Sequence, residues 1–243
     1  FKCWAFTNIP GVDQNGKKPF AEFDAQDRRA IISRWYNEVC AKENQQTSNG
    51  RVLTLDGFLD SYDSSSFINM RPVVDSLSAL AETGRYLPCS PSTEDAYLYG
   101  LRISTGSIGE GFSVNIYGDQ KFLQDVKNDI GSSGKIWVVE NGGEVHIGEG
   151  IDYTAARQRY QLSLTSALGR YLSLFDAPVG KTRHLKFDLP EWTRSGDDYK
   201  AALTAGLFDG NLYMGNNGPV LIRFYKHRDL EENLKAFVDQ VMT

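Results

Sequence analysis

The stretch from Asn211 to Thr243 constrains the fold of this chain more than any other. Branched and aromatic residues on both sides of the turn sequence GNNGP predict a β-hairpin whose second strand runs from Val220 to Tyr225. Asp229 and Glu232 then form the capping-box pattern that opens a helix. This helix is predicted to dock through one apolar face, made of Leu230, Leu234, Phe237, Val238 and Val241.

A looser copy of this pattern lies in the middle of the chain, from Phe112 to Gly148. A strand that ends at Tyr117 leads to Asp119, which is predicted to cap a helix over Phe122 to Ile130. The turn sequence ENGG then separates two branched runs and predicts a second hairpin. These runs are Lys135 to Val139 and Glu144 to Ile147. Two explanations stay open, namely a duplicated unit or the ordinary way in which a strand leads into a helix.

The first part of the chain is predicted to be mainly helical. Asp24 caps a helix whose apolar residues recur at helical spacing, and a second helix over Val73 to Ala81 ends before Gly84, a left-handed cap. The prolines between Pro88 and Glu94 mark a boundary. We therefore expect a mainly helical subdomain, 1–88, and an α+β subdomain, 95–243, which could also pack as one compact domain.

The longest helix is predicted from Tyr153 to Phe175, because Tyr160, Leu164, Leu168 and Tyr171 fit a period of about 3.6 residues. Segments rich in aromatic and branched residues predict strands at 1–6 and 96–104. The predicted fold class is α+β, with a helical N-terminal part and a β-hairpin-rich C-terminal part packed around the helix at 153–175. Helices and strands do not alternate strictly, which argues against a doubly wound parallel sheet.

Composition indicates a soluble globular protein. The chain is 41% hydrophobic, and its net charge of −5 makes duplex nucleic acid an unexpected partner, although a local contact is not excluded. We expect no membrane contact, because no stretch approaches the roughly 18 apolar residues of a membrane span. Three widely spaced cysteines, Cys3, Cys40 and Cys89, favour free thiols in the cytoplasm.

Glu144 and His146 are the candidate catalytic residues. Residues two apart on a strand share a face, so a carboxylate and an imidazole would lie together on the second strand of the predicted mid-chain hairpin. Such a pair can exchange protons or help to bind a divalent metal. The alternative is a solvated strand face opposite Val145 and Ile147. The spacing of the histidines and cysteines predicts no metal site, and the sequence identifies no cofactor.

Candidate ligand-binding residues lie beside glycines and arginines. Tyr99 and Arg102 precede the glycine-rich run 104–111, where backbone amides could approach a phosphate, although a plain turn fits the run equally. Arg157, with Arg159 and Arg170, could receive an acidic or phosphate-bearing partner, or could instead cover the surface of the predicted long helix.

The function favoured by these patterns is recognition or assembly, in which aromatic and arginine surfaces bind another macromolecule, expected to be a protein. Aromatic residues predicted to be exposed carry this expectation, and they are Trp4, Tyr62, Tyr97, Tyr99, Trp192 and Tyr213. The alternative is a nuclease- or transferase-like enzyme that acts on a phosphate-bearing substrate through Glu144 and His146, with Arg102 as a phosphate clamp and metal assistance. A small-ligand binder that uses the glycine-rich run is a third class.

Overall fold

A computed structural model gives the fold of the chain. It describes residues 1–12, 20–41, 51–140, 144–146, 152–154, 159–180, 185–214, 220–222 and 231–242. The chain forms two compact units, Phe1–Ser90 (unit 1) and Pro91–Thr243 (unit 2). Each unit is described by itself below. The predicted division into a helical subdomain, 1–88, and an α+β subdomain, 95–243, stays a prediction.

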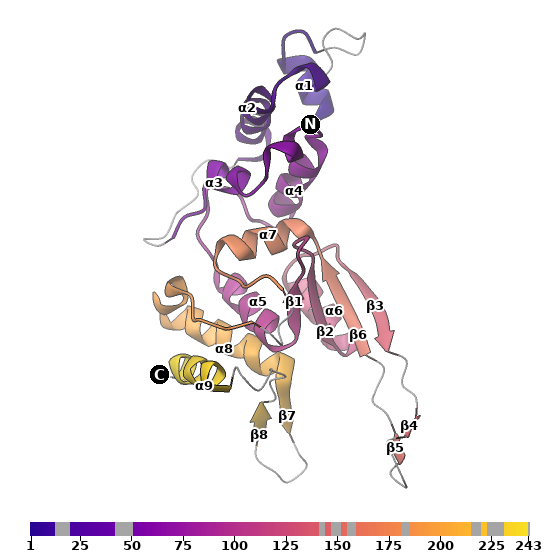
Figure 1. Cartoon of the computed structure of the whole chain (residues 1–243), viewed down its shortest axis with the longest axis vertical. Helices are drawn as coiled ribbons and strands as arrows, with labels where there is room; N and C mark the ends of the chain where they lie inside the picture. The colour runs from indigo at the N-terminus through magenta and orange to yellow at the C-terminus, as the bar shows by residue number, and fades with distance from the viewer. Residues whose placement is uncertain are drawn as a thin grey trace. The chain divides into compact units, whose positions relative to one another are not determined.

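The α-helices and strands follow one another in the order labelled in Figure 1. The helices of unit 1 are α1 (Lys2–Asn8), α2 (Ala25–Trp35), α3 (Leu55–Asp60) and α4 (Arg71–Glu82). Those of unit 2 are α5 (Thr93–Ser104), α6 (Gln120–Asp129), α7 (Ser166–Leu174), α8 (Asp197–Asn211) and α9 (Glu231–Met242). The strands that the structure describes lie in unit 2, and they are β1 (Gly106–Ile108), β2 (Val114–Gly118), β3 (Lys135–Glu140), β4 (Glu144–His146), β5 (Asp152–Thr154), β6 (Arg159–Leu164), β7 (Leu212–Met214) and β8 (Val220–Ile222).

Unit 1 is helical, as its sequence predicts. Asp24 caps α2 by accepting a hydrogen bond from the Asp27 amide, 2.8 Å away, and Gly84 follows α4 with φ of 78°. The predicted strand at 1–6 is wrong, because this segment forms α1. Its aromatic side chains do not line a sheet. They pack with Phe20 and Phe23 against a small core that contains Ala5 and Ile31.

Tyr36 is the largest aromatic side chain in the core of unit 1 with no exposed surface. It lies in a π-helical turn, Tyr36–Cys40, that continues α2. Its hydroxyl accepts a hydrogen bond from the Leu87 amide, 2.7 Å away. Burial raises the pKa of this phenol from 10.0 to about 12, and it outweighs the hydrogen bond, which acts in the opposite direction.

We expect unit 1 to lose stability between pH 10 and pH 12 because of Tyr36. The folded state holds the phenolic proton more tightly than the unfolded chain, so this contribution is complete below the unfolded pKa of 10.0 and disappears toward the folded pKa of about 12. Urea unfolding followed by fluorescence across this range measures the effect. Tyr36→Phe should flatten the pH dependence, whereas Tyr62→Phe, at a half-buried phenol, should keep it. An unchanged slope in Tyr36→Phe would contradict this assignment.

Unit 2 is organised by a four-stranded antiparallel sheet with the strand order β1-β2-β6-β3. Figure 1 shows these strands side by side, with β3 at one edge. Ile116 lies opposite Leu162, and Leu162 lies opposite Ile136. This face is the helix side, because α5 and α6 contact the sheet and a Cβ added to Gly118 would meet Phe122 of α6. Short two-stranded ladders join β4 to β5 and β7 to β8.

Helices α5 and α8 pack closely along their length. A Cβ added to Gly100 would lie 2.2 Å from the carbonyl oxygen of Leu203, and one added to Gly206 would lie 2.2 Å from that of Tyr97. The two glycines therefore let the helix backbones meet where any side chain would hold them apart. Residues about 100 positions apart in the sequence are joined by this contact.

The two predicted strand–helix blocks recur in the structure. Each follows the order helix, strand, strand, helix, as α5-β1-β2-α6 and as α8-β7-β8-α9. Asp119 caps α6 as predicted, and Phe237 and Val241 are buried on the predicted face of α9. The two leading helices also pack against each other, and the shared order fits both a duplicated unit and the ordinary way in which a strand leads into a helix.

The α+β class is confirmed, but the long helix at 153–175 is wrong. This stretch contains β5, β6 and then α7, whose first turn is capped by Thr165. Tyr160 and Leu164 are four residues apart, and a spacing of four suits both a strand period of two and a helix period of about 3.6. The intervening Leu162 has no exposed surface, which identifies the two-residue period of a strand.

Two further strand predictions are corrected. The segment 96–104 is not a strand but lies in α5, which opens with a capping box between Ser92 and Asp95. Most of this helix is buried on several sides, so no amphipathic stripe marks it in the sequence. The predicted mid-chain hairpin is also wrong, because β3 pairs with β6, and β4 pairs with β5. Within the described residues, no helix is long and apolar enough to cross a membrane.

Candidate functional site

The outer sheet face is the side of the four-stranded sheet that points away from α5 and α6. Alternation along β2, β6 and β3 places polar and aromatic side chains on it, while their neighbours fill the core. Two rows of opposed residues cross the strands. The outer sheet face is made of Asn115, Tyr117, Lys135, Trp137, Arg159, Gln161 and Ser163.

A hydrogen-bonded ladder of uncharged groups lies at the centre of the outer sheet face. Gln161 Nε2 donates to Asn115 Oδ1 at 2.8 Å and to Ser163 Oγ at 2.9 Å, and Ser163 Oγ donates to Asn115 Oδ1 at 3.0 Å. These bonds fix the three side chains in one plane of the sheet. Among the described contacts, Asn115 Nδ2 and Gln161 Oε1 remain as a donor and an acceptor for an external group.

Two cation–aromatic pairs flank the ladder. The Arg159 guanidinium carbon lies 5.0 Å from the centre of the Tyr117 ring, and Lys135 Nζ lies 5.6 Å from that of Trp137. Lys135, Trp137 and Arg159 are exposed, whereas Tyr117 is half-buried. The outer sheet face thus presents two cations and two aromatic rings, and Glu140 takes the register position opposite Arg159.

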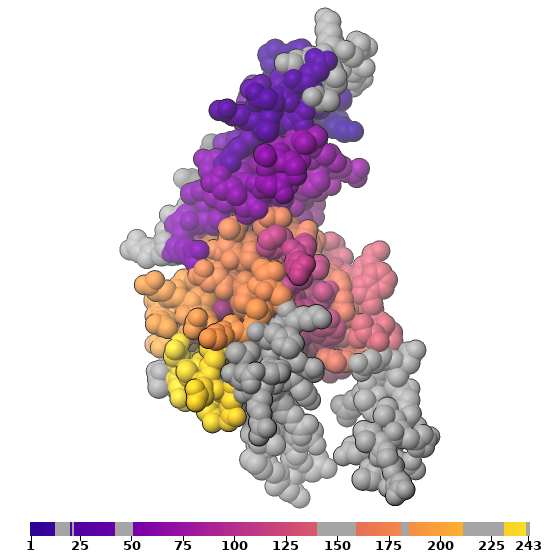
Figure 2. Space-filling model, viewed as in Figure 1, coloured from indigo at the N-terminus to yellow at the C-terminus, as the bar shows by residue number. Residues whose placement is uncertain are grey.

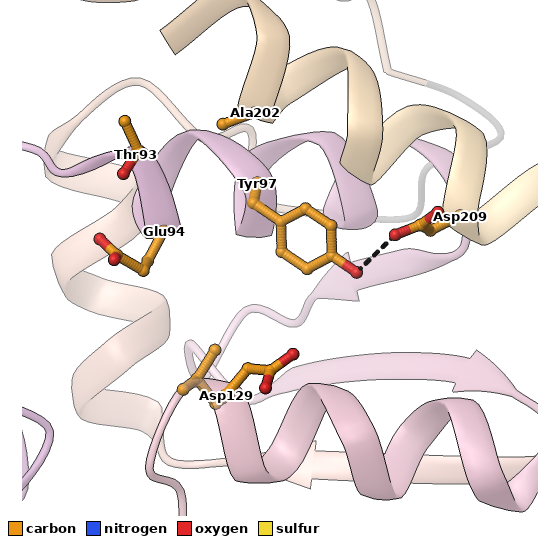
Figure 3. Close-up of a pocket in the computed structure, with 7 residues that line it drawn as sticks. Thr93, Glu94, Tyr97, Asp129, Ala202 and Asp209 are labelled. Atoms are coloured by element: carbon orange, nitrogen blue, oxygen red, sulfur yellow. Dashed lines mark hydrogen bonds between the residues drawn. The ribbon is translucent and has the colours of Figure 1, made fainter. Parts of the chain in front are cut away.

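A second feature of unit 2 is an acidic pocket of about 350 Å³ beside α5, α6 and α8. Figure 3 shows Tyr97 pointing from α5 toward Asp209 of α8, with Glu94 and Asp129 nearby. The Tyr97 hydroxyl donates to Asp209 Oδ2 at 3.0 Å. Burial, together with this hydrogen bond, raises the pKa of Tyr97 above its ordinary range. Among the described residues, no cluster of His, Cys, Asp or Glu side chains is arranged to hold a metal ion.

Tyr99 and Arg102 lie buried on α5. Their side chains donate hydrogen bonds to backbone carbonyl oxygens of the segment that follows α7. Arg102 Nε donates to Pro178 O at 2.8 Å and Nη2 to Gly180 O at 3.2 Å, and the Tyr99 hydroxyl donates to Asp188 O at 3.1 Å. Burial lowers the pKa of Arg102 to about 10, which leaves the guanidinium charged at neutral pH. These contacts give both residues a structural role, and ligand binding by them stays a prediction.

Glu144 and His146 lie at alternate positions of β4, and His146 lies opposite Asp152 of β5. The register therefore puts the two candidate catalytic residues on one face of the strand. The pocket described above does not bring them together with Arg102. Arg157 lies outside the described residues. Catalysis by Glu144 and His146 stays a prediction.

Burial changes the set of aromatic residues available for recognition. Tyr99 and Trp192 were expected at the surface and are only 2% and 6% exposed, since they pack edge to face against each other. Trp137, in contrast, is 52% exposed and is therefore available for recognition. In the sequence, the alternation of polar and apolar residues in 159–164 indicates the outer sheet face. The same segment also fits a helical period, and this second pattern hid the alternation. Comparison with protein-family models, curated proteins and solved structures finds no match.

Proposed function

We propose that this chain is a recognition protein that binds nucleic acid through the outer sheet face. The observation that carries the proposal is the fixed ladder of Asn115, Gln161 and Ser163 between two cation–aromatic pairs. Amide and hydroxyl groups match the donors and acceptors on base edges, cations match phosphates, and aromatic rings match the faces of bases. A sheet can present all three groups on one surface.

Two cations that lie over aromatic rings support nucleic acid as the partner at this surface. The whole chain carries a net charge of −5, which opposes a broad electrostatic attraction to phosphates. The outer sheet face, by contrast, presents Lys135 and Arg159 beside aromatic rings, and Glu140 is the acidic residue in register with Arg159. Binding should therefore depend on local contacts, with only about two phosphates neutralised and a modest dependence on salt.

Fluorescence anisotropy with labelled probes of roughly 20 nucleotides tests this function, using a single strand and a duplex of mixed sequence. Between about 50 and 200 mM NaCl, the slope of log K against log salt should be about −1.4 for the single strand or −1.8 for the duplex. A single-strand preference would indicate stacking on Tyr117 and Trp137, and a duplex preference would indicate reading of a groove by the ladder. Absence of binding to both probes would overturn the proposal in favour of a protein partner.

Substitutions on the outer sheet face should separate the contributions of charge and stacking. Lys135→Ala or Arg159→Ala should weaken binding and bring the salt slope closer to zero by about 0.7 to 0.9, because one phosphate contact is lost. Trp137→Ala should cost about 1–3 kcal/mol of single-strand binding if a base stacks there. The control is Lys121→Ala, which removes an exposed cation from α6 on the helix side. Equal effects of Lys121→Ala and Lys135→Ala would contradict the placement of the site.

A further inference from the structure

A pocket of about 540 Å³ lies within unit 1. This volume falls in the range of roughly 300–1,000 Å³ that is usual for small-molecule sites, whose walls are mostly apolar with a few polar groups. The pocket opens to solvent beside Ile68, which is 70% exposed, and Figure 2 shows the purple part of the chain that contains α4 at the surface. Its apolar wall combines two aromatic and three aliphatic side chains, which are Phe1, Phe20, Ile68, Met70 and Val74.

Contacts inside unit 1 hold this wall in place. The ring centre of Phe1 lies 5.7 Å from that of Phe20, and both rings pack against the small core described above. The buried Arg28 side chain donates from Nη1 to the carbonyl oxygen of Phe67 at 3.0 Å and to that of Ile68. The rings and the turn before α4 are therefore fixed by the fold itself, which lowers the cost of ordering a binding site.

Two cations line the same pocket. Lys2 lies exposed at the start of α1 and Arg71 at the start of α4. Arg71 Nε lies 3.4 Å from Asp75 Oδ2, and this exposed pair holds the guanidinium only weakly. The charged side chains of the described lining, two cations and one carboxylate, thus leave one net positive charge. The positive end of the α4 dipole adds to it, although Asn69 Oδ1 already accepts from the Arg71 amide at 3.3 Å.

We propose that this pocket binds a small monocarboxylate with an aromatic body. The body lies against Phe1 and Phe20, because ring edges and ring faces attract each other, and against the polarisable side chain of Met70. The carboxylate lies at Lys2 and Arg71, where a guanidinium can hold both of its oxygens. One net positive charge matches a monoanion and leaves a dianion such as phosphate uncompensated. The site lies in unit 1 and does not rest on nucleic-acid binding by the outer sheet face.

Isothermal titration of the full chain with 2-naphthoate tests the proposal, and 2-naphthamide is the matched uncharged ligand. We expect a Kd on the order of 100 µM for 2-naphthoate, as is usual for a ligand with few atoms. The amide should bind about tenfold more weakly, because it cannot form a charge-assisted pair with Arg71. Absence of saturable binding up to about 5 mM 2-naphthoate, or equal affinity for the two ligands, would overturn the proposal.

Substitutions on α4 should move the affinity in opposite directions. Arg71→Ala should raise the Kd of 2-naphthoate on the order of tenfold and leave that of the amide unchanged. Asp75→Asn should lower it about threefold, because the side chain no longer competes for Arg71 or repels the ligand. Arg51→Ala is the matched control, since it removes an exposed arginine of unit 1 that does not line the pocket. Equal losses in Arg71→Ala and Arg51→Ala, or weaker binding by Asp75→Asn, would contradict the site.

Methyl NMR of the methionine-labelled chain locates the ligand. The chain has three methionines, and of these Met70 lines the pocket, so its methyl signal should shift with 2-naphthoate. Met70→Leu identifies this signal. A shift at Met214 or Met242 in its place would put the ligand elsewhere and refute the assignment. The melting temperature of each variant confirms that it folds. The titrations contain no nucleic acid, so failure of this site is distinguished from failure of nucleic-acid binding.

Discussion

Replacing Gly100 with alanine should destabilise unit 2 by about 3 kcal/mol, or about 10 °C in melting temperature. The new Cβ would lie 2.2 Å from Leu203 O and 2.9 Å from Leu207 N, both of which are backbone atoms of α8. Backbone cannot rotate away as a side chain can, so the two helices must separate along their whole contact. Thermal unfolding followed by circular dichroism measures the shift.

Gly206→Ala should have a similar effect, because its Cβ would lie 2.2 Å from Tyr97 O on the other helix. The double variant should lose less than the sum of the two single variants, since helices separated by one methyl group already accommodate the other. Gly111→Ala is the control. No atom lies within 4 Å of its added Cβ, so the change should stay within about 0.5 kcal/mol. Additive losses would show that the glycines act separately and not through a shared contact.

Replacing Arg102 with alanine should cost unit 2 about 3–5 kcal/mol. The side chain has no exposed surface, so its removal leaves a cavity between α5 and the loop that contains Pro178 and Gly180. The carbonyl oxygens of those two residues also lose their guanidinium donors. Urea unfolding should show the loss, and limited proteolysis should show faster cleavage near the released loop.

Two further variants divide this loss into its causes. Arg102→Met keeps most of the buried volume but has no donors, so it should fall between Arg102→Ala and the unchanged protein. Arg194→Ala removes an exposed arginine from unit 2, and its expected effect is within about 0.5 kcal/mol. Arg102→Ala with the stability of Arg194→Ala would refute the structural role given to Arg102.

Helix ends and hairpin strands depend on residues that are close together in the sequence, and these features could be predicted from it. Asp24, Asp119 and Gly84 each act at a helix end within a few residues, and the strands of the terminal hairpin pair as expected. The helix α5 could not be predicted in the same way, because α8 and the loop after α7 bury it from outside. The pattern of its apolar residues reflects burial by the rest of the fold and does not show the helical period of a half-exposed helix.

The outer sheet face escaped prediction for a related reason. Asn115 and Gln161 lie 46 positions apart in the sequence and meet only because β6 inserts between β2 and β3. Alternation identifies which side chains share a face of one strand, but it does not tell which strands are neighbours or in which register. Trp137 was likewise absent from the expected surface aromatics, because its exposure depends on the place of β3 at the edge of the sheet.

The close meeting of α5 and α8 has a consequence for synthesis of the chain. Tyr97 and Asp209, joined by a hydrogen bond, are separated by 112 positions. At about 5–20 residues per second, the ribosome delivers α8 roughly 5 to 20 s after α5. During that interval the nascent chain carries a largely apolar helix without its packing partner. A chaperone that holds such segments should therefore associate with the chain after α5 emerges and leave it once α8 is complete.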